Sequence, residues 1–236
     1  FSFNQPKFCP TAAWNPFGIT FANQTTIGDE PGPIFINTNN TIYIQHVGKR
    51  QLSVYHEGHI NPTKTIPINI STAGSIFVTT NDDIYIDNDE VVLKCISNRN
   101  TFDTVMKGKS RCSGLFVDIN DTLYCSMFDL HQVVKRWMND SAMTPTIVAG
   151  TNRSGSALNE LNSPFEIFVD VNFDLYVADC LNNRVQLFQL GQSIGITVAG
   201  NGSPNPTISL SCPTVIVLAA QKYLFIADDG NHRIVG

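Results

Sequence analysis

The chain has 236 residues, of which 15% are charged, and its formal net charge is −5 at pH 7. This length allows one large domain or two small ones with a sizeable core. The acidic balance argues against nucleic-acid binding, which needs a basic face to neutralise phosphates. The longest apolar run, residues 215–220, is far shorter than the roughly 20 residues that span a bilayer.

The N-terminal residues contain one β-strand pattern and no leader pattern. FSFNQPKFCPTAAW, residues 1–14, lacks the basic start and long apolar stretch of a signal peptide, so a secreted form would already have lost its signal. GITFAN, residues 18–23, matches GITVAG at 195–200 near the end of a later unit. We therefore expect residues 14–23 to supply an outer strand for a unit elsewhere in the chain.

From residue 31 onward, a hairpin pattern occurs five times. Each copy has a β-rich run, a short polar turn and a second β-rich run that carries an aromatic residue. The copies are PIFINTNNTIYIQ (33–45), SIFVTTNDDIYID (75–87), GLFVDINDTLYCS (114–126), EIFVDVNFDLYVA (166–178) and VIVLAAQKYLFIA (215–227). The aromatic positions are 42, 39, 52 and 49 residues apart: Tyr43, Tyr85, Tyr124, Tyr176 and Phe225. A period of about 40–50 residues is typical of β-propeller blades.

Two more strand patterns follow each of the first four hairpins. The third strands are expected at 50–56, 90–96, 131–137 and 183–189, and the fourth at 64–69, 103–108, 145–150 and 195–200. Four antiparallel strands form one propeller blade. The sequence therefore predicts an all-β propeller in a single domain, 1–236, with units at approximately 31–69, 73–108, 112–150, 163–200 and 212–236.

The way in which the ring closes has two solutions. The last unit ends within its third strand, so strand 18–23 is expected to complete it and to close a five-bladed ring without a free sheet edge. A native chain that continues past Gly236 would instead supply a sixth blade, which residues 3–23 would complete. The sequence leaves both solutions open.

Polar residues occupy the predicted hairpin turns. Asparagine tolerates the left-handed backbone conformation that tight turns need. We expect this role for Asn39, Asn81, Asn120 and Asn172, with Gln221 in the last copy.

The fourth unit is similar to a known repeat. Residues 164–188 read P-x-x-I-x-V-D-x-x-x-x-L-Y-V-A-D-x-x-N-N-R-V-Q-x-F, and the fifth unit repeats the second half as LFIADDGNHRIV at 224–235. This pattern resembles the NHL repeat; the third unit matches less well, and the first two match weakly. NHL-repeat proteins fold as propellers, usually with six blades. Their uses include protein and RNA binding, cell-surface adhesion and a peptide-amidating lyase, and the fold does not choose among them.

The resemblance implies structural roles for the polar residues of the repeat. Asp179 with Arg184, and Asp228 with Arg233, would brace neighbouring strands by hydrogen bonds. Asp118 and Asp170 stand at the ends of first strands, where we expect them to support the hairpin turns.

Six cysteines without a CxxC pair argue for disulfides and against a zinc ribbon. The predicted strands bring four of them to one face of the ring: Cys112, Cys125, Cys180 and Cys212. The first expected bridge is Cys180–Cys212 between adjacent blades, and the second is Cys112–Cys125 within one blade. Cys9 and Cys95 remain, and a partner in another molecule or in a missing segment of the chain is the alternative for Cys9.

Seven N-x-S/T sequons lie in predicted turns or loops, where a glycan has room. They are Asn23, Asn39, Asn69, Asn120, Asn139, Asn152 and Asn201. Together with the cysteines, they predict a secreted, extracellular glycoprotein.

The histidines do not form a recognisable metal motif. His131 and His232 fall in the same repeat column as Asn183, so the repeat explains them. His56 and His59 form HEGH, which is one residue short of H-E-x-x-H and lies in a loop rather than on a helix. His46 belongs to no motif.

The five first strands are almost wholly apolar, and Glu166 is the one acid at the start of such a strand. The sequence therefore predicts no catalytic residue, no metal ligand and no cofactor. A calcium ion in the central channel is the alternative.

Two classes of function follow. The preferred one is an extracellular NHL-type propeller that acts as a protein-binding or structural module. It would assemble with itself, as an oligomer or polymer, or with other secreted or surface proteins, and not with nucleic acid or through a membrane span. The alternative is a metal-dependent lyase or lactonase-type hydrolase with an ion in the channel. An intracellular RNA or protein scaffold is disfavoured by the acidity, the cysteines and the sequons.

Overall fold

The computed structural model describes residues 21–23, 27, 31–70, 74–96, 101–204, 208–219 and 223–236. Within these ranges the chain consists almost entirely of β-strands and loops, as predicted. The described helices are single turns, and none is long and apolar enough to cross a membrane.

The strands form five antiparallel sheets, which we call blades 1 to 5 in chain order. Blade 1 contains β1 (Pro31–Ile36), β2 (Ile42–His46), β3 (Gln51–Tyr55) and β4 (Lys64–Pro67). Blade 2 contains β5 (Ile76–Val78), β6 (Ile84–Asn88), β7 (Val91–Cys95) and β8 (Phe102–Lys107). Blade 3 contains β9 (Gly114–Val117), β10 (Thr122–Met127), β11 (Gln132–Trp137) and β12 (Thr146–Gly150).

Blade 4 contains β13 (Pro164–Val169), β14 (Leu175–Asp179), β15 (Arg184–Phe188) and β16 (Ile196–Gly200). Blade 5 contains β17 (Pro213–Leu218), β18 (Leu224–Asp228) and β19 (Arg233–Val235). In the last three blades a 3-10 turn joins the second strand to the third: η1 (Phe128–Leu130), η2 (Cys180–Asn182) and η3 (Asp229–Asn231).

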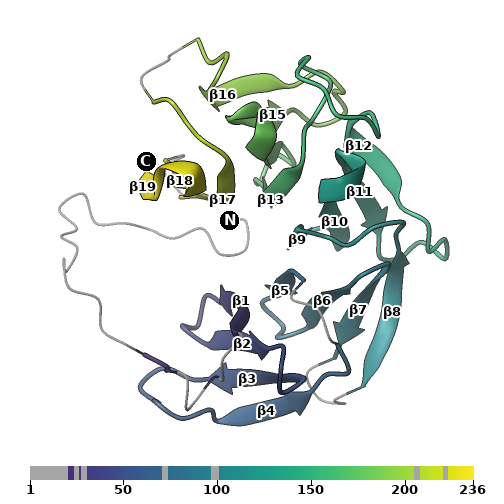
Figure 1. The fold of residues 1–236 in the computed structure, drawn as a ribbon. Helices are drawn as coiled ribbons and strands as arrows, with labels where there is room; N and C mark the ends of the chain where they lie inside the picture. The colour runs from purple at the N-terminus through teal and green to yellow at the C-terminus, as the bar shows by residue number, and fades with distance from the viewer. Residues whose placement is uncertain are drawn as a thin grey trace.

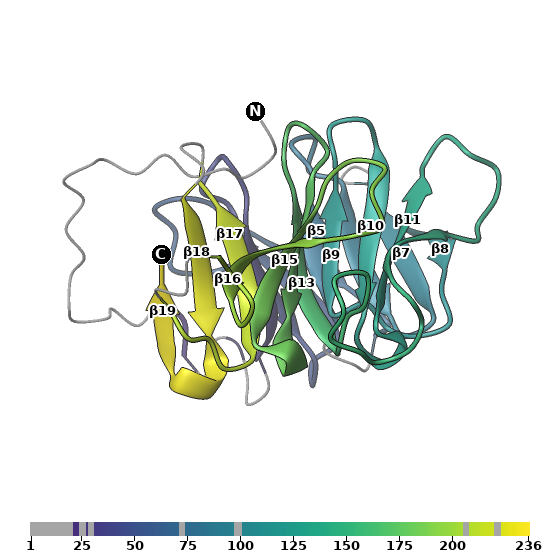
Figure 2. The same cartoon turned by 90° about the horizontal axis from the view of Figure 1, so that it is seen from above.

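The blades are arranged around a central axis as a β-propeller. Within each blade, strands that follow one another in sequence are paired, with the first strand at the axis and the last one toward the rim (Figure 1). Seen from above, the coiled ribbons of η2 (green) and η3 (yellow) lie at the same face of the ring (Figure 2). Between blade 5 and blade 1, no sheet of the described residues fills the ring (Figure 1). The propeller prediction is confirmed.

Each sheet has two different faces because successive side chains of a strand point to opposite sides. The aromatic face carries five paired positions: Phe35 with Tyr43, Phe77 with Tyr85, Phe116 with Tyr124, Phe168 with Tyr176, and Val217 with Phe225. The aliphatic face carries the alternate residues of the first strands: Ile34 and Ile36, Ile76 and Val78, Leu115 and Val117, Ile167 and Val169, and Ile216 and Leu218. These two faces are the surfaces through which blades pack.

The aromatic face of each blade points toward the next blade in the chain. Tyr43 donates a hydrogen bond to Asp82 Oδ1 of blade 2 at 3.0 Å, and the Phe35 and Phe77 ring centroids are 5.1 Å apart. The aliphatic face therefore points toward the preceding blade, and the aliphatic first-strand residues of blades 2 to 5 are buried. Each Å² of apolar surface that is buried in these interfaces stabilises the fold by about 25 cal/mol, so the interfaces are the main source of stability.

The predicted closing strand, 18–23, falls largely outside the described residues. Its described part, residues 21–23, is not a strand, and blade 5 has three strands within the described part of the chain. The strands of the five observed sheets span residues 31–67, 76–107, 114–150, 164–200 and 213–235.

The hairpin turns differ in one detail from the prediction. The left-handed residue is the one after each predicted asparagine: Asn40, Asp82, Asp121 and Phe173, with φ between 55° and 64°. The reason is an Asx turn, in which the side chain at the end of the first strand accepts hydrogen bonds from backbone amides of the loop. Asp118 Oδ1 accepts from the amides of Asn120 and Thr122, both at 2.9 Å. Asp170 does the same at 2.8 and 3.0 Å, so the turn-support role of both aspartates is confirmed.

Candidate functional site

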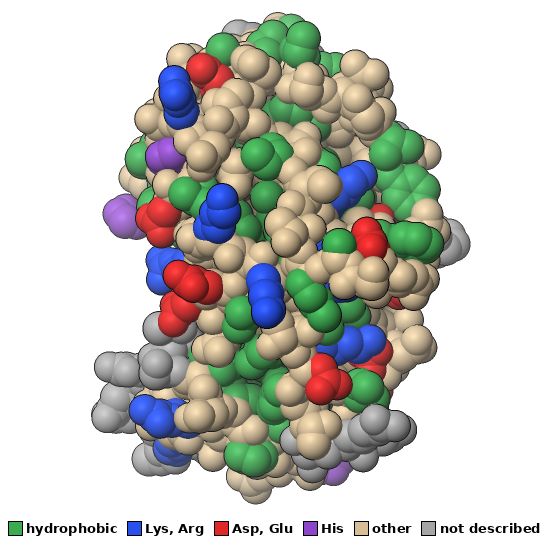
Figure 3. Space-filling view, turned by 90° about the vertical axis from the view of Figure 1, so that its right-hand side faces the viewer, with side chains coloured by type: hydrophobic (Ala, Val, Ile, Leu, Met, Phe, Trp, Pro, Cys, Tyr) green, Lys and Arg blue, Asp and Glu red, His purple; other side chains and the backbone are tan. Residues whose placement is uncertain are grey.

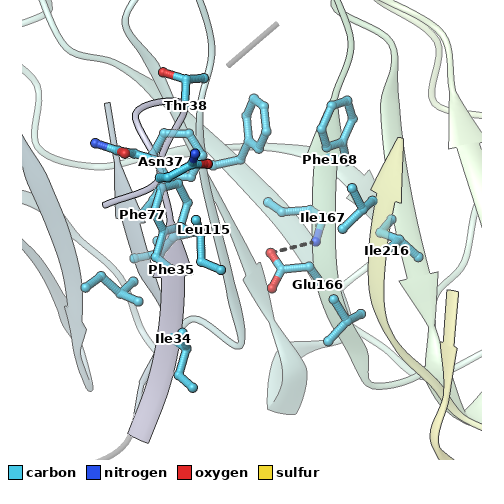
Figure 4. Close-up of a pocket in the computed structure, with 16 residues that line it drawn as sticks. Ile34, Phe35, Asn37, Thr38, Phe77, Leu115, Glu166, Ile167, Phe168 and Ile216 are labelled. Carbon is cyan, nitrogen blue, oxygen red and sulfur yellow. Dashed lines mark hydrogen bonds between the residues drawn. The ribbon is translucent and has the colours of Figure 1, made fainter. Parts of the chain in front are cut away.

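A cavity of about 660 Å³ lies at the centre of the ring, where the first strands of all five blades contribute its wall. Its volume is in the range of about 300–1,000 Å³ that small-molecule sites occupy. The wall is mainly apolar, with Leu115, Ile167 and Ile216 among the residues labelled in Figure 4. On the outer rim that carries β8 and β12, hydrophobic side chains are interspersed with polar and charged groups (Figure 3).

An aromatic ladder crosses the cavity wall. The centroids of Phe77 and Phe116 are 5.0 Å apart, and those of Phe116 and Phe168 are 5.1 Å apart. With Phe35, these rings bring four successive blades together at the axis. Tilted and edge-to-face rings at this separation attract one another through their quadrupoles.

Glu166 is the charged residue in this wall. It lies on β13, is partly exposed, and has a carboxyl group among the apolar side chains of the cavity (Figure 4). Its Oε1 accepts a hydrogen bond from the amide of Ile167 at 3.3 Å. Burial raises the pKa of Glu166 to about 8, against a smaller lowering by this hydrogen bond. The reason is that an apolar wall solvates the charged carboxylate much less well than water does.

Gly114 on β9 makes room for Glu166. A Cβ atom at position 114 would lie 2.9 Å from Glu166 Cα and 3.0 Å from Glu166 Oε1. Both distances are shorter than ordinary carbon contacts, so any larger residue would displace β13 or the carboxyl group. The backbones of blades 3 and 4 are therefore close together at the carboxyl group.

One end of the cavity is polar, because the β1–β2 turn supplies Asn37, Thr38 and Asn40 to the wall. The Asn37 side chain is already engaged: its Oδ1 accepts from the amides of Asn39 and Thr41 at 2.9 Å, and its Nδ2 donates to Asp82 Oδ1 at 3.1 Å. Asn37 is consequently a structural residue of the turn.

The Asp and Arg residues of the repeat form the expected brace, and they are not among the residues that line the cavity. Arg184 Nε donates to Asp179 Oδ2 at 2.7 Å, while its other nitrogens donate to the carbonyls of Ser156, Ala157 and Glu160. In blade 5, Arg233 Nε donates to Asp228 Oδ2 at 2.8 Å and Arg233 also donates to the Ser209 carbonyl. Each brace ties the loop before a blade to the blade itself, so these residues are structural.

The repeat also explains two of the histidines. His131, Asn183 and His232 each follow a 3-10 turn in the left-handed conformation. His131 Nδ1 accepts from the Ser163 amide at 3.0 Å, as Asn183 Oδ1 accepts from the Cys212 amide at 2.9 Å. Both bonds link one blade to the next.

The other histidines are separate from one another. His46 is buried, with Nδ1 donating to the Ile27 carbonyl at 2.6 Å and Nε2 hydrogen-bonded to Ser53 Oγ at 2.8 Å. His56 and His59 are exposed in the β3–β4 loop. Within the described ranges, no three His, Cys, Asp or Glu side chains gather in a way that could hold a metal ion.

The described residues contain two disulfides, and they join the pairs that the strand positions predict. Cys112–Cys125 lies within blade 3, and Cys180–Cys212 joins blade 4 to blade 5. Cys125 lies inside β10, which continues to Met127. Cys95 is buried and has no disulfide partner among the described residues, and Cys9 lies outside them.

All seven sequon asparagines are exposed, as glycosylation requires. They lie in loops or hairpin turns, so their occupancy stays a prediction that the fold permits.

Asp87 is a buried acid that the sequence does not single out. Its Oδ1 accepts from the Cys112 amide at 2.8 Å, while its Oδ2 has no hydrogen-bond partner in the described part of the chain. Burial raises the pKa of Asp87 to about 7. In blades 4 and 5 the position equivalent to Asp87 holds Ala178 and Ala227. An acid at a position that is alanine in other copies of the repeat is the sequence signal that could have identified Asp87.

No family model and no curated protein matches this sequence. Solved structures do match. An auxiliary nutrient binding protein from Bacteroides thetaiotaomicron aligns with a TM-score of 0.68 and 14% identity over 86% of this chain and 58% of that one. A streptogramin B lyase gives 0.63 and 13% over 86% and 64%.

The nidogen/laminin complex gives a TM-score of 0.66 and 12% identity over 84% of this chain and 71% of that one. At these identities the likeness shows the fold alone, and that fold is the β-propeller. The chain spans less than two thirds of the length of the lyase and of the nutrient-binding protein.

Proposed function

We propose that this chain is an extracellular NHL-type propeller that works as a structural module and assembles with further copies of itself. The observation that carries the proposal is a pair of apolar sheet faces that no sheet of the described residues covers. We call them the blade 1 face (Ile34, Ile36) and the blade 5 face (Val215, Ile234).

The blade 1 face is the aliphatic one. Ile34 and Ile36 are 58% and 53% exposed, whereas the same positions in the next blade, Ile76 and Val78, are 5% and 1% exposed. The difference arises because the aliphatic face points toward the preceding blade, and no preceding sheet is present in the described residues.

The blade 5 face is the aromatic face of its sheet. Val215 and Ile234 lie on the same side of the sheet as Phe225, since Val215 pairs with Ala227 and Ala227 with Ile234. Ile234 is 77% exposed. In blades 1 to 4, this side of the sheet packs against the aliphatic face of the next blade.

The two faces are therefore complementary in the way that the four junctions within the chain are. The blade 5 face of one copy fits the blade 1 face of another, which gives a head-to-tail contact. A contact of this kind joins two different surfaces, so it produces closed rings or open polymers rather than two-fold dimers.

Three observations support an extracellular NHL-type protein. The braces of blades 4 and 5 use the Asp, Asn and Arg of the repeat motif. Two disulfides are formed, which is usual for proteins of oxidising compartments. The sequon asparagines are exposed. The nidogen/laminin complex shows that a propeller of similar fold occurs in a protein assembly.

The test is the mass in solution by light scattering after enzymatic removal of glycans. We expect assemblies of several copies of the 26.0 kDa chain, which Ile234→Asp and Ile36→Asp dissociate. Ile60→Asp is the matched control, because Ile60 is 74% exposed in a loop outside both faces. A monomer at all concentrations would overturn the proposal. So would protection of β19 from hydrogen exchange in a monomer, because another part of the same chain would then cover the face.

A metal-dependent lyase or lactonase-type hydrolase is the second candidate. It has less support, because the described residues place one carboxyl group, Glu166, in the central cavity and form no cluster that could hold a metal ion. Stoichiometric metal in the purified protein, measured by mass spectrometry and lost in Glu166→Gln, would support this candidate.

A further inference from the structure

We propose that the central cavity binds a small organic ammonium ion with an apolar body, and that the Glu166 carboxylate is its counter-ion. This inference concerns the wall around Glu166. Ile34, Ile36 and Val215 of the assembly faces line other parts of the same cavity, so the cavity includes part of the proposed contact surface.

The first step is the isolation of the carboxyl group. In the described part of the chain its one hydrogen bond is the 3.3 Å contact with the Ile167 amide, just beyond the usual range of about 2.7–3.2 Å. The three ion pairs of the described residues lie elsewhere and use Asp83, Asp179 and Asp228. Among the described residues that line the cavity there is no lysine, arginine or histidine. One carboxyl oxygen is thus left to bind a donor that enters the cavity.

The second step is the electrostatics of the empty cavity. β9 (GLFV) and β17 (PTVIVL) carry no titratable side chain, Asp179 of β14 is bound to Arg184, and Tyr124 of β10 donates to Asp118. Burial alone therefore keeps the pKa of Glu166 near 8, and the empty site is mainly protonated at neutral pH. A cation beside the carboxyl group favours the ionised form, and this attraction is strong where the surroundings are apolar.

The third step is the chemistry of the wall around the carboxyl group. Phe116 and Phe168 offer ring faces and edges, and Leu115 and Ile216 offer aliphatic surface. An ammonium group gains from aromatic rings as well as from a carboxylate. Figure 4 shows Glu166 with Leu115, Phe168 and Ile216, and Phe116 lines the same cavity.

The fourth step excludes other ligand classes. A calcium ion takes about 6–8 oxygen ligands, whereas the wall near Glu166 offers one carboxyl group among apolar side chains. An anion would be repelled by the Glu166 carboxylate, and the described wall has no cationic side chain to bind it. A monovalent cation with an apolar body matches both parts of the wall.

The position of Glu166 is fixed in advance of binding. Gly114 lets β9 approach to within contact of Glu166 Cα, and Ser126 Oγ donates to the neighbouring Phe165 carbonyl. A carboxylate that is already positioned loses little conformational entropy when the ligand binds.

The experiment is isothermal titration calorimetry with 2-phenylethylamine as the probe, against its neutral analogue 2-phenylethanol. We expect the amine to bind at least tenfold more tightly than the alcohol, and Glu166→Gln to remove that preference. Glu57→Gln is the matched control, since Glu57 is exposed in the β3–β4 loop. The affinity of this variant for the amine should equal that of the wild type. Thermal unfolding of each variant checks that the fold is kept.

A second readout is proton release. Because binding ionises Glu166, affinity should rise with pH from 6 until about 8, and the binding enthalpy at pH 7 should vary with the ionisation enthalpy of the buffer. Equal binding of amine and alcohol, no binding of either probe, or unchanged affinity in Glu166→Gln would each overturn the proposal. Tight calcium binding that Glu166→Gln abolishes would also overturn it, in favour of a metal site.

Discussion

Blades 4 and 5 hold the loops before them with a charged brace, whereas blades 1 to 3 have other residues at the same two positions. The braced pairs are Asp179 with Arg184 and Asp228 with Arg233, and the corresponding pairs are His46 with Gln51, Asn88 with Val91, and Met127 with Gln132. All five sheets nevertheless have the same strand order. The brace therefore anchors loops and does not determine the blade fold.

Blades 2 and 3 use a different polar residue to reach the next blade. Asp87 accepts from the Cys112 amide, and Ser126 donates to the Phe165 carbonyl, whereas blades 4 and 5 have Ala178 and Ala227 at that position. The first units thus resemble the NHL repeat weakly because different polar residues make their contacts between blades. Their sheets still pack through the same two apolar faces.

The largest effect should come from breaking the blade 4 brace. Arg184→Ala leaves the buried Asp179 carboxylate without its cation and should reduce the free energy of unfolding by about 3–5 kcal/mol. Arg233→Ala should cost about 1–2 kcal/mol, because the Arg233 side chain is 44% exposed. Gln132→Ala, at the same position in blade 3, is the control. Denaturant unfolding measures all three, and equal losses would contradict the difference between the blades.

The two disulfides should also differ. Replacing Cys180 and Cys212 together by serine opens a loop of 32 residues and should cost about 4 kcal/mol on the chain-entropy model. Replacing Cys112 and Cys125 opens a loop of 13 residues and should cost about 3 kcal/mol. Unfolding of both double variants under the same oxidising conditions tests the order. A larger loss for the shorter loop would show that native contacts, and not chain entropy, dominate.

The close approach of blades 3 and 4 can be tested at one atom. Gly114→Ala places a Cβ atom 2.9 Å from the Phe165 carbonyl and from Glu166 Cα, both of which are backbone atoms, and should cost about 1–3 kcal/mol. Gly48→Ala is the control: its Cβ atom would meet nothing within 4 Å, so we expect a change within about 0.5 kcal/mol. Thermal unfolding separates the two, and equal melting temperatures would be inconsistent with the contact.

The smallest effect concerns pH and the buried acid of blade 2. Asp87 has a pKa of about 7 when folded and about 3.9 when unfolded, so the unfolded chain loses its proton first as pH rises. Stability is therefore full below about pH 4 and decreases until about pH 7. Between pH 5 and 8 the decrease should be about 2 kcal/mol smaller in Asp87→Asn than in the wild type. Asp103→Asn, at an exposed position, should keep the wild-type decrease. An unchanged decrease in Asp87→Asn would remove Asp87 as its source.

Much of the structure could be predicted because its signals are local. The hairpins, their period and the apolar first strands follow from alternation within a few residues, and the Asp–Arg braces follow from one motif. The pairing of Cys180 with Cys212 could be predicted because equivalent strand ends lie at the same face of a propeller. The turn prediction missed by one residue, because the Asx turn of Asp118 moves the left-handed position to Asp121.

The chemistry of the candidate site could not be predicted in the same way. Glu166 is visible in the sequence as one acid in an apolar strand, but its pKa depends on Leu115, Ile216 and the phenylalanine ladder, which come from other blades. Asp87 depends likewise on Gly74, which packs against it, and on the Cys112 amide of the next blade.

Each blade can be predicted from the amino-acid sequence, since it is a short-range pattern of β-strands and turns with an apolar side. Which side chains have packing partners depends on how the blades are arranged. Ile76 and Ile34 occupy the same place in the repeat, yet Ile76 is buried by a neighbouring blade and Ile34 is exposed because no described sheet precedes blade 1. Burial is a property of the neighbours that the fold supplies, and the repeat pattern does not contain it.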